Sequence, residues 1–187
     1  MPRVKLANGA LRDQIRQDLF DTITQEAATS ITGTNKFFTD VQNKGSHLTN
    51  LRQNQLLENQ VSYLVQGLGF NAIVSDVANV AILPLVQDHS AYKLIIGEKT
   101  YWEGPLRYVS GNIAQEGDFL AQLGSHDNAK YALKGQDSIA IPPLQSFKCE
   151  WTVQGYTAAE EAASLPAAGT RVFYVARLLG LLRRPVQ

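Results

Sequence analysis

The sequence contains a single cysteine, no long apolar run and no excess of either charge. Because Cys149 has no second cysteine to pair with, a disulfide within the chain is excluded. No stretch reaches the roughly 18 consecutive apolar residues of a membrane-spanning helix, and residues 1–20 lack the continuous apolar core of a signal peptide. We therefore expect a protein that is made and kept inside a cell, or that leaves the cell by lysis.

Charge is balanced along the chain as well as in total. The sequence contains seventeen Lys and Arg residues and seventeen Asp and Glu residues, and it has no block of like charge. This pattern predicts neither a specific nucleic-acid partner nor a basic surface for a membrane. Glutamine and asparagine are abundant, which favours hydrogen-bonded contacts between protein surfaces.

Motifs of the common catalytic and metal centres are missing from the sequence. There is no G-x-S-x-G elbow and no phosphate-binding Walker loop. His47, His89 and His126 are far apart, and none has a second ligand at a metal spacing. Glu160 and Glu161 show no sign of the differing environments that a carboxylate pair needs for acid–base catalysis. We therefore predict that the protein is not an enzyme and has no catalytic residue, cofactor or metal.

Short strands account for most of the pattern that is present. Apolar side chains alternate with polar ones in a strand after Pro142 and Pro143, at Phe147, Cys149, Trp151 and Val153. The prolines cannot donate to a ladder and therefore belong at the entrance of this strand. Cys149 is in phase with Phe147 and Trp151, so we interpret it as a small core residue without chemistry.

Further strands give the fold class. Residues 92–96 and 99–102 flank Gly97-Glu98, which predicts a hairpin with a two-residue turn. Residues 170–179 are apolar on both faces, which is typical of a strand buried between layers. Together these patterns predict a mainly β chain with about eight antiparallel strands, arranged as a single jelly-roll sandwich or barrel.

The N-terminal segment has a different period. Four apolar residues recur at every fourth position and predict an amphipathic helix over residues 10–25: Leu11, Ile15, Leu19 and Ile23. A linker of small residues follows, so we divide the chain into a helical arm at residues 1–34 and a jelly-roll domain at residues 35–187. We expect the four apolar residues to contact a protein partner. Trp102, beside Gly104-Pro105, is a candidate aromatic anchor of an interface.

The glycine-rich stretch Gly67-Leu68-Gly69-Phe70 admits three interpretations. With Asp88 about twenty residues later, it fits the letters of a dinucleotide-binding loop. The letters GLGF also occur in loops that bind the carboxylate of a peptide C-terminus. Because β-branched residues rather than a helix follow it, the favoured interpretation is a bend within a strand.

Several segments together resemble a known family. These are FFTDVQNKG (37–45), LTNLRQNQLLENQVSYLVQGLGF (48–70), KLIIGEKTYWEGPLRYV (93–109), IAIPPLQSFKCEW (139–151) and RVFYVARLLGLLRRPVQ (171–187). In this order they resemble jelly-roll capsid proteins of icosahedral bacteriophages, including the single jelly-roll shell proteins of membrane-containing phages.

The resemblance implies a viral structural protein that assembles with itself into capsomers and with other capsid proteins into an icosahedral shell. It also implies assembly in the host cytoplasm, residence in the virion capsid, and an arm that reaches under a neighbour or toward an internal membrane. An alternative stays open, in which the jelly roll is a cupin- or lectin-like binding or enzymatic domain with a ligand at the end of the barrel.

Overall fold

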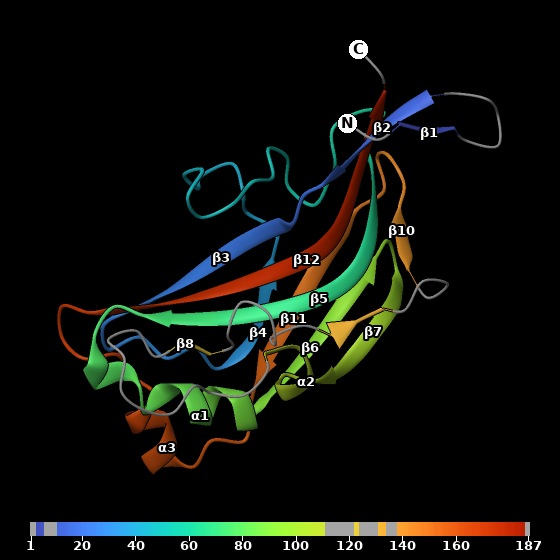
Figure 1. Cartoon of the computed structure of the whole chain (residues 1–187). Coiled ribbons are helices and arrows are strands. Elements are labelled where there is room, and N and C mark those ends of the chain that lie inside the picture. The colour runs from blue at the N-terminus through green and yellow to red at the C-terminus, as the bar shows by residue number, and fades with distance from the viewer. Residues whose placement is uncertain (1–2, 6–10, 111–121, 124–130, 134–137, 186–187) are drawn as a thin grey trace.

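The computed structural model describes residues 3–5, 11–110, 122–123, 131–133 and 138–185, which form two antiparallel sheets (Figure 1). Sheet A contains β1 (Arg3–Lys5), β2 (Leu11–Arg16), β3 (Leu19–Glu26), β5 (Ser62–Val74), β8 (Gln122–Leu123), β9 (Tyr131–Ala132), β10 (Ile139–Ile141) and β12 (Arg171–Pro185). Sheet B contains β4 (Gly33–Phe37), β6 (Ser90–Ile96), β7 (Lys99–Pro105) and β11 (Phe147–Val153). The helices are η1 (Val77–Asn79), α1 (Ile82–Asp88), α2 (Arg107–Ser110) and α3 (Ala158–Ala163).

The strands pair in a nested pattern. β3 pairs with β12, β4 with β11, β5 with β10, and β6 with β7, all antiparallel. The chain is therefore folded back on itself like one long hairpin. Additional pairs of β5 with β12 and of β6 with β11 gather the strands into sheets A and B. The predicted mainly β sandwich is confirmed, whereas the two sheets remain separate and form no closed barrel.

Sheet B agrees with the local sequence signals. In β11 every second residue is buried, and Cys149 is fully buried. β6 and β7 form the predicted hairpin, with Gly97 at a φ of +61° in the two-residue turn. Such a positive φ favours glycine, which explains the position of this residue. The predicted core role of Cys149 is confirmed.

Aromatic side chains join the two sheets. The ring of Trp151 in sheet B lies 4.5 Å from that of Tyr174 and 5.2 Å from that of Phe70, both in sheet A. Its indole N–H donates to the hydroxyl of Ser90 at 2.9 Å, so the buried polar atom has a partner. This cluster fills the space between the sheets.

The predicted N-terminal helix is wrong, because residues 11–26 form β2 and β3. A spacing of four residues keeps side chains on one face of a helix, but four is also an even number and keeps them on one face of a strand. The buried position between Leu19 and Ile23 holds a polar residue, Asp21, whose carboxylate has partners within the chain. Asp21 is fully buried, accepts from the backbone N–H of Phe38 at 2.6 Å and pairs with Lys44 at 2.8 Å.

Sheet A extends beyond sheet B at one end, where β5 and β12 curve away from the sandwich and carry β2 and β1 with them (Figure 1). The register shifts between Leu179 and Gly180. A Cβ on Gly180 would lie 2.0 Å from the carbonyl oxygen of Leu64, so only glycine fits this close approach. We call β1, β2 and residues 180–185 of β12 the distal end.

The helices η1, α1 and α3 lie at the opposite end of the molecule, which we call the helical end (Figure 1). In α3, Thr157 and Glu160 form a capping box that satisfies backbone donors of the first turn. No helix in the described part of the chain is long and apolar enough to cross a bilayer.

Candidate functional site at the distal end of sheet A

The four residues predicted to contact a partner lie in β2 and β3. Leu19 is 3% exposed, so the chain's own core already covers it. Ile23 packs against the same core, while Ile15 is half-buried in β2 opposite Leu182. Leu11 begins β2 and pairs in register with Lys5 of β1. Their contact with a partner stays a prediction, and it applies best to Ile15, because Leu19 offers almost no surface.

Trp102 lies in β7, half-buried against the core, with its ring 6.2 Å from that of Tyr92. A Cβ on Gly104 would lie 3.1 Å from the indole, so this glycine leaves room for the ring. The indole therefore has a packing role within the chain, and its role as an interface anchor stays a prediction.

Gly67 to Phe70 lie within β5 and pair with residues 176–179 of β12. Phe70 is fully buried in the aromatic cluster. Backbone groups in a ladder are engaged with the neighbouring strand. The dinucleotide-loop and peptide-carboxylate interpretations are therefore wrong, and the stretch is part of a strand.

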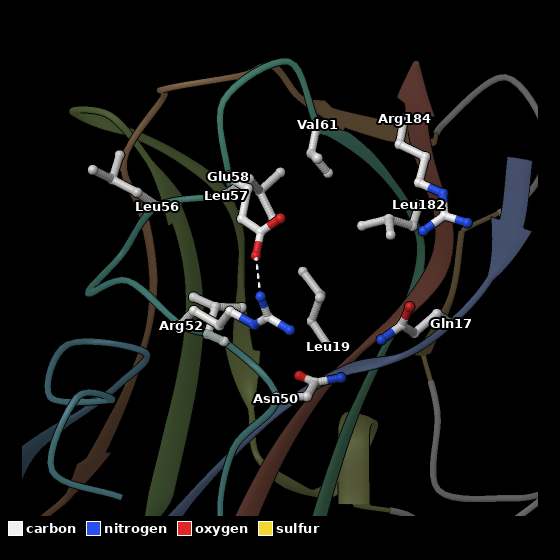
Figure 2. A pocket seen from close by; sticks show the side chains of 11 residues that line it. Gln17, Leu19, Asn50, Arg52, Leu56, Leu57, Glu58, Val61, Leu182 and Arg184 are labelled. Carbon is white, nitrogen blue, oxygen red and sulfur yellow. Dashed lines mark ion pairs between the residues drawn. The ribbon is translucent and has the colours of Figure 1, made fainter. Parts of the chain in front are cut away.

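A cleft of about 220 Å³ opens on the inner face of the distal end (Figure 2). Residues from the link between β2 and β3, from β3 and β12, and from the loop between β4 and β5 line it: Gln17, Leu19, Asn50, Leu51, Arg52, Leu56, Leu57, Glu58, Val61, Leu182 and Arg184. Arg52 and Glu58 meet across its opening at 3.3 Å, and Arg184 reaches toward the same space from β12 (Figure 2).

Hydrogen bonds fasten the loop wall of the cleft to the start of β3. The side chain of Asn50 accepts from the backbone N–H of Phe20 at 2.9 Å and donates to the carbonyl oxygen of Asp18 at 2.6 Å. The single O–H of Tyr63 is shared between the carbonyl oxygens of Gln17 and Leu178, which lie 2.8 and 2.6 Å from the hydroxyl oxygen. The cleft is thus preformed. Its apolar wall and the guanidinium of Arg184, beside the Arg52–Glu58 pair, suit a small amphipathic anion, and its volume lies below the roughly 300–1,000 Å³ of ordinary ligand pockets.

Basic residues gather at the distal end. Six of its residues are basic and one is acidic: Arg3, Lys5, Arg12, Asp13, Arg16, Arg183 and Arg184. The ladder places Arg16 opposite Leu181 and Arg184 opposite Asp13. Local sequence patterns do not reveal this cluster, because its members come from opposite ends of the chain and only the pairing of β2 with β12 unites them.

The helical end carries the opposite charge. Residues 75–89 and 154–170 contain no Lys or Arg and four acidic residues: Asp76, Asp88, Glu160 and Glu161. Nε2 of His89 lies 3.4 Å from a carboxylate oxygen of Glu160. Hydrogen bonds from the backbone and hydroxyl of Thr157, with a smaller contribution from His89, lower the pKa of Glu160.

The structure does not gather the histidines. His47 lies in an exposed loop, His89 lies at the helical end, and His126 lies outside the described residues. Within the described ranges, no three His, Cys, Asp or Glu side chains are placed to hold a metal ion. Comparisons with protein-family models, with curated proteins and with solved structures found no match for this chain.

Proposed function

We propose that the protein is a jelly-roll subunit of a virus shell, which acts by assembling with copies of itself and with other shell proteins. The observation that carries the proposal is the nested strand pairing. The eight strands β3 to β7 and β10 to β12, numbered in chain order, stand in the order 1-8-3-6 in sheet A and 2-7-4-5 in sheet B. This order supports two interlocked Greek keys, the arrangement of a jelly roll.

Jelly-roll proteins have several kinds of function, so the fold alone does not select one of them. The outer face of sheet A supports assembly. In β12 the alternate residues Val172, Tyr174, Ala176 and Leu178 are fully buried in the core. The residues that alternate with them face the other side of sheet A. These are interrupted by Arg177, which pairs with Asp18, and four of them are apolar and half-buried: Phe173, Val175, Leu179 and Leu181. An apolar row of this kind on an outer sheet face is typical of a surface that a second protein covers. It supports association between copies.

The test measures assembly of the purified full-length chain. Light scattering after size exclusion, together with negative-stain electron microscopy, should detect capsomers, rings or shells at micromolar protein. Val175→Lys should shift the population to monomers, because it places a charge on the outer face of sheet A. Gln42→Lys adds the same charge to an exposed loop residue and should assemble like the natural chain. A compact monomer at every concentration would contradict the proposal.

The cleft supports one second candidate, a jelly-roll binding domain with a ligand at the end of the sandwich. Its lining combines leucines with Arg52 and Arg184, so a small carboxylic acid with an apolar tail is the probe to use. Octanoate should raise the melting temperature of the natural chain, and Arg184→Met should abolish this rise. If octanoate leaves both melting temperatures unchanged, this candidate is wrong.

A further inference from the structure

The charges that remain after ion pairing separate along the molecule. Across the described residues, most charged groups of the sandwich body are neutralised in pairs, including Lys44 with Asp21, Lys93 with Glu103 and Arg171 with Glu26. None of these pairs contains Arg16, Arg183 or Arg184. The distal end therefore keeps a positive excess, and the helical end keeps a negative one, although the chain as a whole is neutral.

Arg183 and Arg184 occupy successive positions near the end of β12 and therefore project to opposite faces of sheet A. Arg184 lines the cleft on the inner face, whereas Arg16 of β2 is exposed beside Leu181. Both sides of the distal end thus carry guanidinium groups. The Nε–H groups of Arg183 and Arg184 are buried, and the structure gives them no acceptor among the described residues.

Three kinds of anionic partner compete for such a surface. The acidic helical end of a second copy offers four carboxylates, but exposed charge pairs between proteins govern rate and specificity more than affinity. A membrane surface usually requires exposed large apolar or aromatic residues beside the basic ones; the strands of the distal end contain no aromatic residue, and Ile15, Leu181 and Leu182 are half-buried. A nucleic acid instead carries a dense row of phosphates, and each phosphate that is neutralised releases condensed counterions.

We propose that the distal end binds the phosphodiester backbone of nucleic acid without reading its sequence. Its basic side chains that the structure describes are those of Arg16, Arg183 and Arg184, and the planar guanidinium donates two parallel hydrogen bonds to a phosphate. The inference goes beyond assembly and does not depend on it, because a single copy carries the whole surface.

The test titrates the full-length chain into a fluorescein-labelled 20-base-pair DNA duplex of mixed sequence, and records anisotropy between 50 and 200 mM NaCl. The logarithm of the binding constant should fall linearly with the logarithm of the salt concentration, with a slope of about −0.9 for each phosphate contacted. Arg16→Gln/Arg183→Gln/Arg184→Gln should flatten this slope by about 2.7 and weaken binding at 50 mM NaCl at least tenfold.

The matched control removes the same amount of charge elsewhere. Lys36→Gln/Lys99→Gln/Arg107→Gln neutralises three exposed basic residues outside the distal end, and it should change the binding constant less than twofold. Arg16→Gln alone serves if the triple variant does not fold, since Arg16 is exposed and its loss should flatten the slope by about 0.9.

Three results would overturn the inference. The first is no binding of the duplex at 50 mM NaCl. The second is an equal loss of binding in the distal-end and control variants, which would assign the effect to diffuse charge. The third is binding to phosphatidylglycerol vesicles but not to the duplex, which would identify a membrane as the partner. A distal-end variant that loses the duplex but still assembles would separate this inference from the shell proposal.

Discussion

The body of the sandwich and the distal end of sheet A are built from the same two long strands, but they are stabilised differently. In the body, β5 and β12 face sheet B across a cluster of fully buried aromatic side chains. At the distal end β12 pairs with β2 as well as with β5, and the inner face of the sheet meets a loop and a cleft. Burial of apolar surface therefore stabilises the body, while backbone pairing and charge dominate the distal end.

This difference separates stability from recognition. Substitutions in the body should change the free energy of unfolding, because they create cavities or leave buried charges without partners. Substitutions of exposed polar side chains at the distal end should change contacts with other molecules and leave the free energy of unfolding almost unaltered, as such substitutions usually do. If an exposed polar substitution at the distal end lowered the free energy of unfolding as much as a substitution in the body, this division would be wrong.

The largest expected effect is that of Trp151→Ala. The indole is fully buried between the sheets and contacts Phe37, Phe70 and Tyr174. Its removal should lower the free energy of unfolding by about 4 kcal/mol, from lost transfer energy and the remaining cavity. Urea unfolding followed by circular dichroism measures the loss. Trp102→Ala is the control, and it should cost clearly less because that indole is only half-buried.

The next effect concerns the buried ion pair. Lys44→Met removes the cation from the buried carboxylate of Asp21 and leaves it the backbone N–H of Phe38, which should destabilise the fold by about 3 kcal/mol. Lys93→Met breaks an exposed pair with Glu103 and should cost at most about 1 kcal/mol. Equal losses in the two variants, measured by urea unfolding, would contradict the importance of burial.

The junction between the two regions can be broken at Gly180. An added methyl group would collide with the backbone of Leu64, so Gly180→Ala should cost about 2 kcal/mol by forcing the strands apart. Hydrogen exchange measured by mass spectrometry should show faster exchange in residues 62–65 and 180–185 than in β11. Gly33→Ala is a useful reference, because its Cβ meets no atom within 4 Å although its φ is +85°. Uniform acceleration over both sheets would contradict a local junction.

The sequence predicts the regions that depend on local signals. The alternation around Cys149 and the two-residue turn at Gly97 are local, and both β11 and the β6–β7 hairpin appear where they were expected. β3 was mistaken for a helix because a spacing of four residues fits both structures. Asp21 also hides the alternation of this strand, because it places a charged residue at a buried position. Its partner Lys44 lies in a loop 23 residues later, so a local pattern does not reveal the pair.

The candidate site was less accessible to sequence reasoning than the fold. Arg16 and Arg184 are separated by most of the chain, and balanced charge along the sequence gives no indication that they lie on neighbouring strands. Only the antiparallel pairing of β2 with the last residues of β12 brings them together. Local patterns could reveal β12 as a strand but not its neighbour at the distal end, so they could not predict the cleft or the basic surface.

A smaller effect concerns alkaline pH and Cys149. Burial raises the pKa of its thiol from 9.0 to about 12. Below pH 9 the thiol is protonated in both the folded and the unfolded chain, so its contribution to stability is fully present. Between pH 9 and pH 12 only the unfolded chain releases the proton, and stability falls by about 1.4 kcal/mol per pH unit.

The variant Cys149→Ala removes this contribution, and the comparison is cleanest below pH 10, because burial and the neighbouring Cys149 both raise the pKa of Tyr92 above its ordinary value of 10.0. The difference in unfolding free energy between the natural chain and the variant should stay constant from pH 6 to pH 9. It should then shrink as the pH rises to 11. Urea unfolding at four pH values measures the difference, and a constant value throughout would show that the thiol does not keep its proton in the folded state.

The smallest effect on stability is expected for Arg16→Gln at the distal end. Arg16 is exposed in β2, and a glutamine keeps the strand and most of the side-chain length, so the free energy of unfolding should change by less than about 0.5 kcal/mol. The same substitution should still flatten the salt dependence of duplex binding. A change in binding without a change in unfolding would assign Arg16 to recognition. A loss of stability comparable with that of Lys44→Met would instead mean that the distal end is part of the structural core, and the distinction between the two regions would fail.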